Sequence, residues 1–297
     1  MRAARLVVPL LILALMRAVT AMSANLPTVQ ERLARGKYLV EGPVACGHCH
    51  TPKTAAGVPI ASAYLSGAFV IEAKGVKIYA PNITMDPQTG IGKWSDAEIV
   101  RAIREGIRPD GSIMGALMPS AFYRGMTDTD VSSIVAYLRA TKPIRNAVSR
   151  SHLPAPRATA PAVAVADLLG TPSRDSSLRH ATYVAVTLAH CIGCHTPRVD
   201  GQRDFSRTGA GGELFPDMFG LGFTAVAANI TSDPVFGLGA WTDEEIKRAI
   251  TEGVGRGGRA LLPVMPFQNY RNMTRDDLAA IVAYLRSLPP RRMQVAQ

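Results

Sequence analysis

A five-residue pattern, C-x-x-C-H, occurs twice in this chain and constrains its fold more than any other feature. The copies are Cys46–His50 and Cys191–His195, each followed by Thr-Pro. Two further segments recur: Asn82-Ile83-Thr84 as Asn229-Ile230-Thr231, and Trp94–Ile99 as Trp241–Ile246. The separation is 145 residues at the cysteines and 147 from the asparagine onward. Such self-similarity predicts a tandem duplication with two domains of one architecture.

The motif also predicts a chemistry. Residues three and four apart share one face of a helical turn, so two thiols and the next histidine project together. This spacing is typical of covalent c-type haem attachment, in which the cysteines hold the porphyrin and the histidine binds the iron. We therefore expect two haems, one held by Cys46, Cys49 and His50, the other by Cys191, Cys194 and His195.

A redox-active dithiol and half of a zinc site are the alternatives for a single C-x-x-C pair. The histidine that follows both pairs favours haem over either alternative. The chain has four cysteines, and the two motifs use all of them. None remains for a disulfide or for a further metal site.

The N-terminus has the layout of a secretory signal peptide. Two arginines precede an apolar run, Leu6–Met16, and small residues follow up to Ala21 and Ala24, where cleavage is expected. An uncleaved membrane anchor is the alternative, but the run has 11 residues, against the roughly 20 needed to cross a bilayer. We expect residues 1–24 to be a signal peptide and the protein to be periplasmic.

The charge of the chain argues against nucleic-acid binding. The formal net charge is +10 and falls to +7 without residues 1–24, which carry three arginines and no acid. The surplus is spread along the chain, and no run of Lys or Arg suits a phosphate backbone. A mildly basic surface suits an acidic protein partner instead.

Proline marks the boundary between the repeats. Four prolines lie between Pro143 and Asp175 among Ala, Ser, Arg and Thr, a composition that sustains neither a helix nor a central strand. We interpret residues 143–175 as an extended linker between a first domain at 25–142 and a second at 176–297.

Helix signals dominate each repeat, and the fold class expected is all-α. Thr28 and Glu31 form a capping box that opens a helix ahead of the first motif, and residues 176–188 play the same part in the second repeat. The other helices are expected between Ser95 and Gly106, Thr242 and Gly253, Thr127 and Pro143, and Thr274 and Pro289.

A histidine-bound haem iron has a sixth position, and methionine is the candidate ligand. Of the 11 methionines, two pairs fall at equivalent places. Met126 and Met273 directly precede helix caps, where packing as hydrophobic staples accounts for them. Met118 and Met265 precede proline in loops and have no such role. We assign them as axial ligands, because a thioether suits reduced iron and raises its potential.

Several other residues keep two interpretations. Trp94 and Trp241 fit either a haem wall or a staple on the following helix. Asn82 and Asn229 fit either a hydrogen bond to a haem propionate or an Asx turn. His48 and His190 adjoin the motifs without being equivalent, so surface positions are expected for them.

Together these segments resemble the repeats of multi-haem c-type cytochromes. The resemblance rests on C-x-x-C-H-T-P, then Asn-Ile-Thr-x-Asp-Pro, Gly-x-Trp-Ser-Asp, Met-Pro and Met-Thr-x-x-Asp before a final helix, and covers roughly 26–142 and 176–288. It is strongest to the cytochrome subunits that accept electrons from periplasmic alcohol, aldehyde and sugar-acid dehydrogenases. It implies two tandem class I cytochrome c domains, with His50 and Met118 on one iron and His195 and Met265 on the other.

The resemblance also implies partners. A dehydrogenase subunit is expected as the electron donor, a terminal oxidase or another cytochrome as the acceptor, with peripheral association at a membrane. Those dehydrogenase subunits usually carry three haem domains and a C-terminal membrane-binding segment. This chain has two motifs and a short polar tail, which counts against direct reaction with quinone.

The function expected is single-electron transfer by a periplasmic dihaem cytochrome c, without catalytic residues of its own. A dihaem enzyme of the peroxidase or thiosulfate dehydrogenase type is the alternative. A peroxidase needs an open iron and acid–base groups beside it, and equivalent Met-Pro loops in both repeats count against that. The thiosulfate enzymes use a cysteine on the catalytic iron, and no cysteine is spare here.

Overall fold

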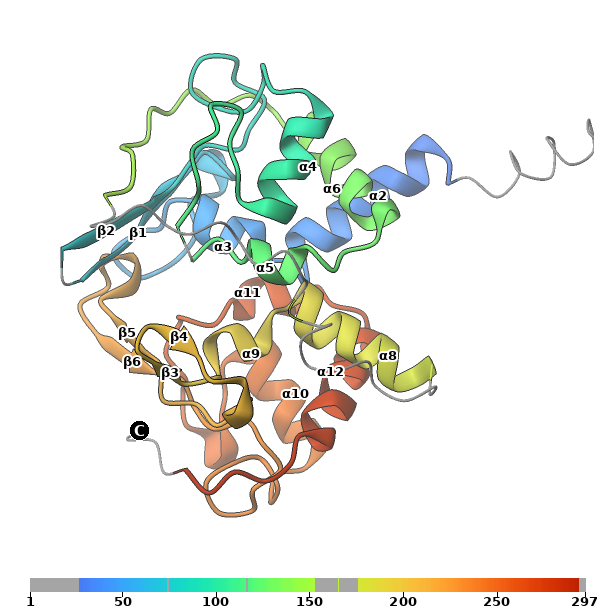
Figure 1. Ribbon diagram of the computed structural model, residues 1–297, viewed down its shortest axis with the longest axis vertical. Coiled ribbons are helices and arrows are strands. Elements are labelled where there is room, and N and C mark those ends of the chain that lie inside the picture. The colour runs from blue at the N-terminus through green and yellow to red at the C-terminus, as the bar shows by residue number, and fades with distance from the viewer. Residues whose placement is uncertain (1–26, 74, 116, 153–164, 166–175, 294–297) are drawn as a thin grey trace, which may run out of the picture.

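The computed structural model describes residues 27–73, 75–115, 117–152, 165 and 176–293. The expected signal peptide at 1–24 and most of the expected linker lie outside these residues. Two halves of similar build lie one above the other, the first running from blue to green and the second from yellow to red (Figure 1).

The described residues of the first half form three helices of ten residues or more, several shorter helices that include the one carrying the motif, and one hairpin. Its elements are α2 (Val29–Glu41), α3 (Cys46–His50), η1 (Ala61–Ala63), β1 (Ala68–Ala73), β2 (Val76–Ala80), α4 (Asp96–Glu105), α5 (Ser120–Tyr123) and α6 (Asp128–Arg139).

The second half repeats this order with additions around its motif. Its helices are α8 (Ser176–Thr182), the π-helix η2 (Tyr183–Leu188), α9 (Cys191–Cys194), η3 (Phe205–Arg207), η4 (Met218–Gly220), α10 (Asp243–Glu252), η5 (Arg256–Gly258), α11 (Phe267–Tyr270) and α12 (Arg275–Ser287). Its strands are β3 (Arg198–Val199), β4 (Gln202–Arg203), β5 (Leu214–Pro216) and β6 (Thr224–Val226). Within the described residues, no helix combines the length and apolarity needed to cross a membrane.

The predicted helix ends are confirmed because they depend on local chemistry. Thr28, Ser95 and Thr242 each form a capping box with the glutamate three residues on. The helices α4 and α10 end at Gly106 and Gly253, both in the left-handed conformation that glycine adopts readily.

The first and last helices of each half pack together, and in the first half they approach very closely. Gly36 on α2 lies against α6, where an added Cβ would be 1.9 Å from the Ser133 carbonyl oxygen. The equivalent residue of α8 is Ala181, which is buried against α12 without such a restriction. Glycine therefore sets the spacing of the helix pair in the first half.

The all-α expectation holds only in part. The helices carry the core, but in the part of the chain that the structure describes they are accompanied by three two-stranded antiparallel sheets: β1 with β2, β3 with β4, and β5 with β6. The longest pairing joins Ala68–Ala73 to Val76–Ala80 and is interrupted by a bulge between Phe69 and Ile71. These hairpins lie beside the motifs, and β1 contacts both η4 and β5 of the other half.

Residues 143–152 of the expected linker lie against the first half, whereas Val165, the other linker residue that the structure describes, is buried in a core cluster formed mostly by the second half. The Ile144 backbone nitrogen donates to Thr84 Oγ1 at 3.1 Å. Further along, the backbone of His152 exchanges two hydrogen bonds with Lys77, at 2.7 and 3.0 Å. Residues 143–152 thus form an extended segment along the surface of the first half.

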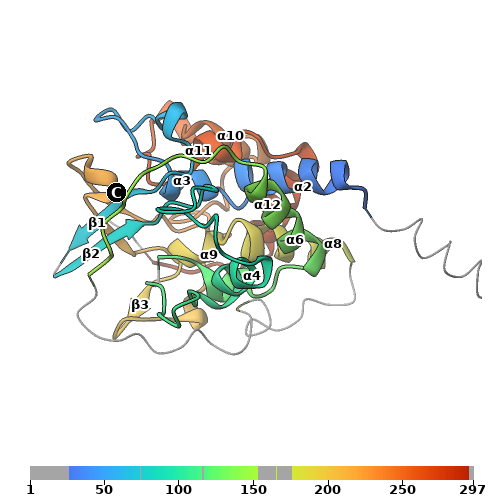
Figure 2. The ribbon, with the colours of Figure 1, turned by 90° about the horizontal axis from the view of Figure 1, so that it is seen from above.

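Reciprocal contacts join the two halves. Tyr38 of α2 donates its hydroxyl to Asp277 of α12, and Tyr183 of η2 donates to Asp130 of α6 at 2.6 Å. Because each half supplies one tyrosine and one aspartate, the halves are related by an approximate two-fold axis. The short helices α5 and α11 lie where the halves meet, and the view from above shows α2 and α8 pointing to the same side (Figures 1 and 2).

Candidate functional site: two facing motifs on one cavity

Each C-x-x-C-H motif forms a short helix entered through an unusual residue. Ala45 precedes α3 with φ 52°, and His190 precedes α9 with φ 40°. The left-handed region is costly for residues with a Cβ, so strain at the same place in both halves marks a constrained site. It turns the chain sharply so that the motif faces inward.

The structure identifies the partner of each motif histidine. Nδ1 of His50 lies 2.7 Å from the carbonyl oxygen of Pro81, and Nδ1 of His195 lies 2.7 Å from that of Ala228. A carbonyl only accepts, so Nδ1 carries the hydrogen and Nε2 keeps a free lone pair. Burial lowers the pKa of both histidines, which favours the neutral form that binds metal.

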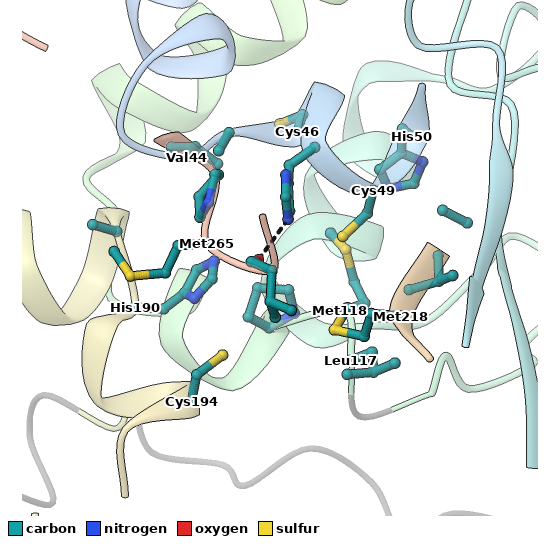
Figure 3. Close-up of a pocket in the computed structure, with 18 of the residues that line it drawn as sticks. Val44, Cys46, Cys49, His50, Leu117, Met118, His190, Cys194, Met218 and Met265 are labelled. Atoms are coloured by element: carbon teal, nitrogen blue, oxygen red, sulfur yellow. Dashed lines mark hydrogen bonds between the residues drawn. The ribbon is translucent and has the colours of Figure 1, made fainter. Parts of the chain in front are cut away.

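One cavity of about 1250 Å³ joins the two motifs. It exceeds the roughly 300–1,000 Å³ of a typical small-molecule site. All eight predicted site residues line it: Cys46, Cys49, His50, Met118, Cys191, Cys194, His195 and Met265. Figure 3 shows side chains from both motifs, including Cys49 and Cys194, directed at this space. The cavity therefore has room for more than one ligand.

The cysteines are poor candidates for thiolate chemistry. Burial raises the pKa of Cys46 and of Cys191 to about 12, and that of Cys194 to about 11. Thiols held protonated at neutral pH are weak nucleophiles and weak metal ligands. This environment counts against a reactive dithiol. Among the described residues, no group of three or more His, Cys, Asp or Glu side chains could hold a metal ion, which counts against zinc.

The two pairs of methionines that recur between the repeats lie in different environments. Met118 and Met265 line the cavity from the loops before α5 and α11. Met126 and Met273 are 3% and 7% exposed and pack in the cores. Met114 and Met218 also line the cavity. Sequence comparison between repeats missed these two because neither has a methionine at the equivalent place.

The tryptophan and asparagine pairs that recur between the repeats differ in their contacts. Trp94 and Trp241 line the cavity and also pack against the core, a position that is compatible with either interpretation. Asn82 accepts from the Thr84 backbone nitrogen at 2.9 Å and donates to the Ile144 carbonyl at 2.7 Å. Asn229 repeats this with Thr231 and the Arg291 carbonyl. The asparagines thus form the Asx turn and clamp the chain that follows the last helix.

The expectation that His48 and His190 lie at the surface is wrong. Both are half-buried and line the cavity between the motifs. His48 Nε2 donates to the Val264 carbonyl of the other half at 2.8 Å, and the His190 ring packs against Tyr123. Burial lowers the pKa of His48 to about 3 and that of His190 to about 4, so both are neutral. Only the packing of the halves, which no local pattern shows, places them there.

The fold and these motifs define a c-type cytochrome with two repeats. Residues 33–142 and 184–289 each match the Cytochrome c family, and the chain belongs to that family. The match confirms the expected tandem of two cytochrome c domains. Covalently bound haem c is the cofactor that this family implies, and the neutral histidines, buried thiols and apolar cavity walls fit it.

Several relatives share most of the chain. The cytochrome c subunit of the alcohol dehydrogenase (quinone) of Gluconacetobacter polyoxogenes is 30% identical over 82% of this chain and 53% of its own length. The fructose dehydrogenase cytochrome subunit of Gluconobacter japonicus is 29% identical over 91% and 54%. A diheme cytochrome c-type protein of Cereibacter sphaeroides is 30% identical over 82% of both chains. The chain thus spans about half the length of the dehydrogenase subunits.

Proposed function

We propose that this protein is a dihaem cytochrome c that transfers single electrons. Cys46 and Cys49 would hold one haem and Cys191 and Cys194 the other. His50 with Met118, and His195 with Met265, would fill the axial positions of the two irons. The observation that carries the proposal is the pair of equivalent motifs facing one cavity, each with its histidine bound to a backbone carbonyl.

The chain's own residues prepare the site for rapid electron transfer. When bound, each haem supplies an iron that changes by one electron. The carbonyls of Pro81 and Ala228 orient the histidine rings and increase their basicity toward metal. The apolar cavity walls exclude water, which favours the less charged, reduced state and raises the potential.

The cavity lining offers little for the enzymatic alternative. No aspartate or glutamate is among the described residues that line it. Its histidines outside the iron-binding positions are His48 and His190, whose pKa values of about 3 and about 4 make them poor proton donors near pH 7. The cavity lining therefore offers a peroxidase no ready general acid at neutral pH.

The donor and the compartment belong to the same proposal. Relatives named as cytochrome subunits of alcohol, fructose and gluconate dehydrogenases support a dehydrogenase as the donor. A terminal oxidase or another cytochrome would receive the electrons. The N-terminal sequence supports export to the periplasm, and the basic surface suits an acidic partner.

Replacing the axial methionines tests this function. We expect Met118→Ala and Met265→Ala each to remove the methionine-to-iron charge-transfer band of one haem. The potential of that haem should fall by more than about 59 mV, a tenfold change for a one-electron couple, and its ferrous form should bind carbon monoxide. Redox titration with visible spectra measures all three effects.

Two other cavity methionines provide the control. Met114→Leu and Met218→Leu should keep both charge-transfer bands. Unchanged spectra in both alanine variants, or loss of a band in a leucine variant, would show that the ligands are assigned wrongly. A preparation with fewer than two haems per chain would contradict the dihaem proposal itself.

A further inference from the structure

The two halves of the cavity differ in polarity at equivalent positions. In the first half the wall carries Gln88, Thr89, Arg108 and Ser112. At the same offset of 147 residues, the second half carries Val235, Phe236, Gly255 and Arg259. At these positions the first haem site therefore has four polar side chains, whereas the second has two apolar side chains, a glycine and one arginine.

Arg108 is the most informative of these residues. It is half-buried on the loop between α4 and α5, where its backbone nitrogen donates to the Ser112 carbonyl at 2.9 Å and its Nη1 to Ser112 Oγ at 3.2 Å. Desolvation lowers its pKa, and the charge of Arg150 lowers it further against the opposing effect of Asp110. Among the described residues, no carboxylate lies within ion-pair distance of Arg108.

The nearest acid is already engaged. Asp110 accepts from the Ser112 hydroxyl and lies 3.3 Å from Arg150. A partly buried cation without a counter-ion is costly, and Arg108 faces a cavity whose described lining contains no carboxylate. Arg108 thus provides a planar, bidentate donor for a carboxylate that the protein does not itself supply.

The second half lacks this arrangement. Gly255 has no side chain, and Arg259 is exposed to solvent. The neighbouring Arg256 is also exposed and lies 3.7 Å from Glu245. Arg256 and Arg259 line the cavity, and Arg203 is partly buried but lies 4.0 Å from Glu213. Exposed or paired charges act weakly through water and salt, so we expect these arginines to influence a haem less than Arg108 does.

We propose that Arg108 pairs with a propionate of the haem in the first half and makes that haem the higher-potential centre of the two. The inference rests on the proposed dihaem function. Reduction of the iron removes one positive charge from the haem, so a nearby, poorly solvated cation favours the reduced state. Electrons that enter at the second haem then pass to the first, which sets the direction of transfer within the chain.

The test is a potentiometric titration of the full-length holoprotein that resolves both haems. Arg108→Gln should lower the higher midpoint potential by roughly 59 mV, a tenfold change for one electron, and leave the lower one in place. Arg108→Lys keeps the charge and should retain most of the potential. Arg271→Gln, which removes an exposed arginine of the other half outside the cavity lining, should shift neither potential by more than about a third of that amount.

A second variant adds the charge where it is missing. Gly255 has φ −75°, which any residue adopts, and an added Cβ would meet only the end of the Leu261 side chain closely. Gly255→Arg should raise the lower potential. An unshifted higher potential in Arg108→Gln, or a shift of the lower one instead, overturns the inference.

The same samples separate this inference from the function on which it rests. Haem content and the methionine-to-iron band are measured alongside the potentials. Two haems with intact bands but no effect of Arg108→Gln reject the propionate pairing and leave the dihaem function standing. Fewer than two haems reject both. If Arg108→Gln does not fold, the titrations of Arg108→Lys and Gly255→Arg decide the question. A lower midpoint potential that does not rise in Gly255→Arg counts against the pairing.

Discussion

At the scale of single residues, the site depends on atoms that have no sequence signature. The Nδ1 atoms of His50 and His195 are fixed by backbone carbonyls, which any residue type could supply. What fixes those carbonyls is the buried asparagine that follows in each half. Asn82 is 2% exposed and ties its turn to the chain beyond α6. A structural side chain therefore positions the histidine that would bind iron.

Replacing Asn82 should weaken both stability and the haem site. Asn82→Ala leaves the Thr84 backbone nitrogen without its acceptor and leaves the Ile144 carbonyl with only the longer hydrogen bond from Thr84 Oγ1, at 3.3 Å. Because each buried polar group left unpaired costs about 1–3 kcal/mol, we expect a loss of about 3 kcal/mol in the free energy of unfolding, measured by urea titration of the holoprotein. The first haem's potential should fall as the Pro81 carbonyl moves.

The control is Ser132→Ala, at an exposed hydroxyl on α6. Surface changes of this kind usually stay within about 0.5 kcal/mol. If Asn82→Ala is no more destabilising than Ser132→Ala, the clamp has no energetic importance.

At the scale of elements, the crossing of α2 and α6 is set by one missing side chain. An alanine at position 36 would place its Cβ 1.9 Å from the Ser133 carbonyl oxygen and 2.7 Å from Tyr137 Cβ. Backbone atoms of a packed helix do not move aside easily, so the helices would have to separate. The packing of α2 against α6 therefore tolerates only glycine at position 36.

Gly36→Ala should destabilise the holoprotein by at least about 2 kcal/mol through this overpacking. Ala181→Gly, at the equivalent position of α8, should cost only about 1 kcal/mol through helix propensity and lost packing. Chemical denaturation followed by far-ultraviolet circular dichroism compares the two. A smaller loss for Gly36→Ala than for Ala181→Gly would contradict the close crossing.

The elements also show which features sequence can predict. Capping boxes at Thr28, Ser95 and Thr242 are local, and their helices begin where predicted. The hairpin β1–β2 was not predicted because its residues lack a clear alternation of buried and exposed positions. The shared cavity, and the positions of His48 and His190 in it, depend on contacts between the two halves. Some of these contacts join residues more than 200 positions apart in the sequence, such as His48 and Val264.

At the scale of the whole molecule, two tyrosine–aspartate hydrogen bonds join the halves, and the two aspartates differ in the other side chains that bind them. Asp130 also accepts two hydrogen bonds from Arg35 of its own half, at 2.8 and 2.9 Å. Asp277 has only His180 in the equivalent place, at 3.0 Å. The two ends of the interface are therefore alike in geometry and different in charge.

This difference predicts the effect of removing each tyrosine hydroxyl. Tyr183→Phe leaves Asp130 paired with Arg35. Among the described residues, Tyr38→Phe leaves the Asp277 carboxylate with His180 as its side-chain hydrogen-bond partner. Because hydrogen bonds to charged groups contribute about 1.5–3 kcal/mol, we expect Tyr38→Phe to cost about 2 kcal/mol and Tyr183→Phe about 1 kcal/mol in thermal unfolding. Tyr64→Phe is the control, since within the described residues the buried Tyr64 hydroxyl has no partner. If Tyr183→Phe cost as much stability as Tyr38→Phe, or more, Arg35 would not be the stronger second partner that we infer.

The reciprocal pairs have a consequence for how such a chain arises. Each half carries both a donor and an acceptor, so its inner surface is complementary to a copy of itself, as in a symmetric homodimer. Fusing two such subunits makes their association independent of concentration. Once joined, the copies are free to diverge, as Arg35 and His180, or Arg108 and Gly255, have done. A single gene can then encode two unequal redox centres within an inherited, nearly symmetric scaffold.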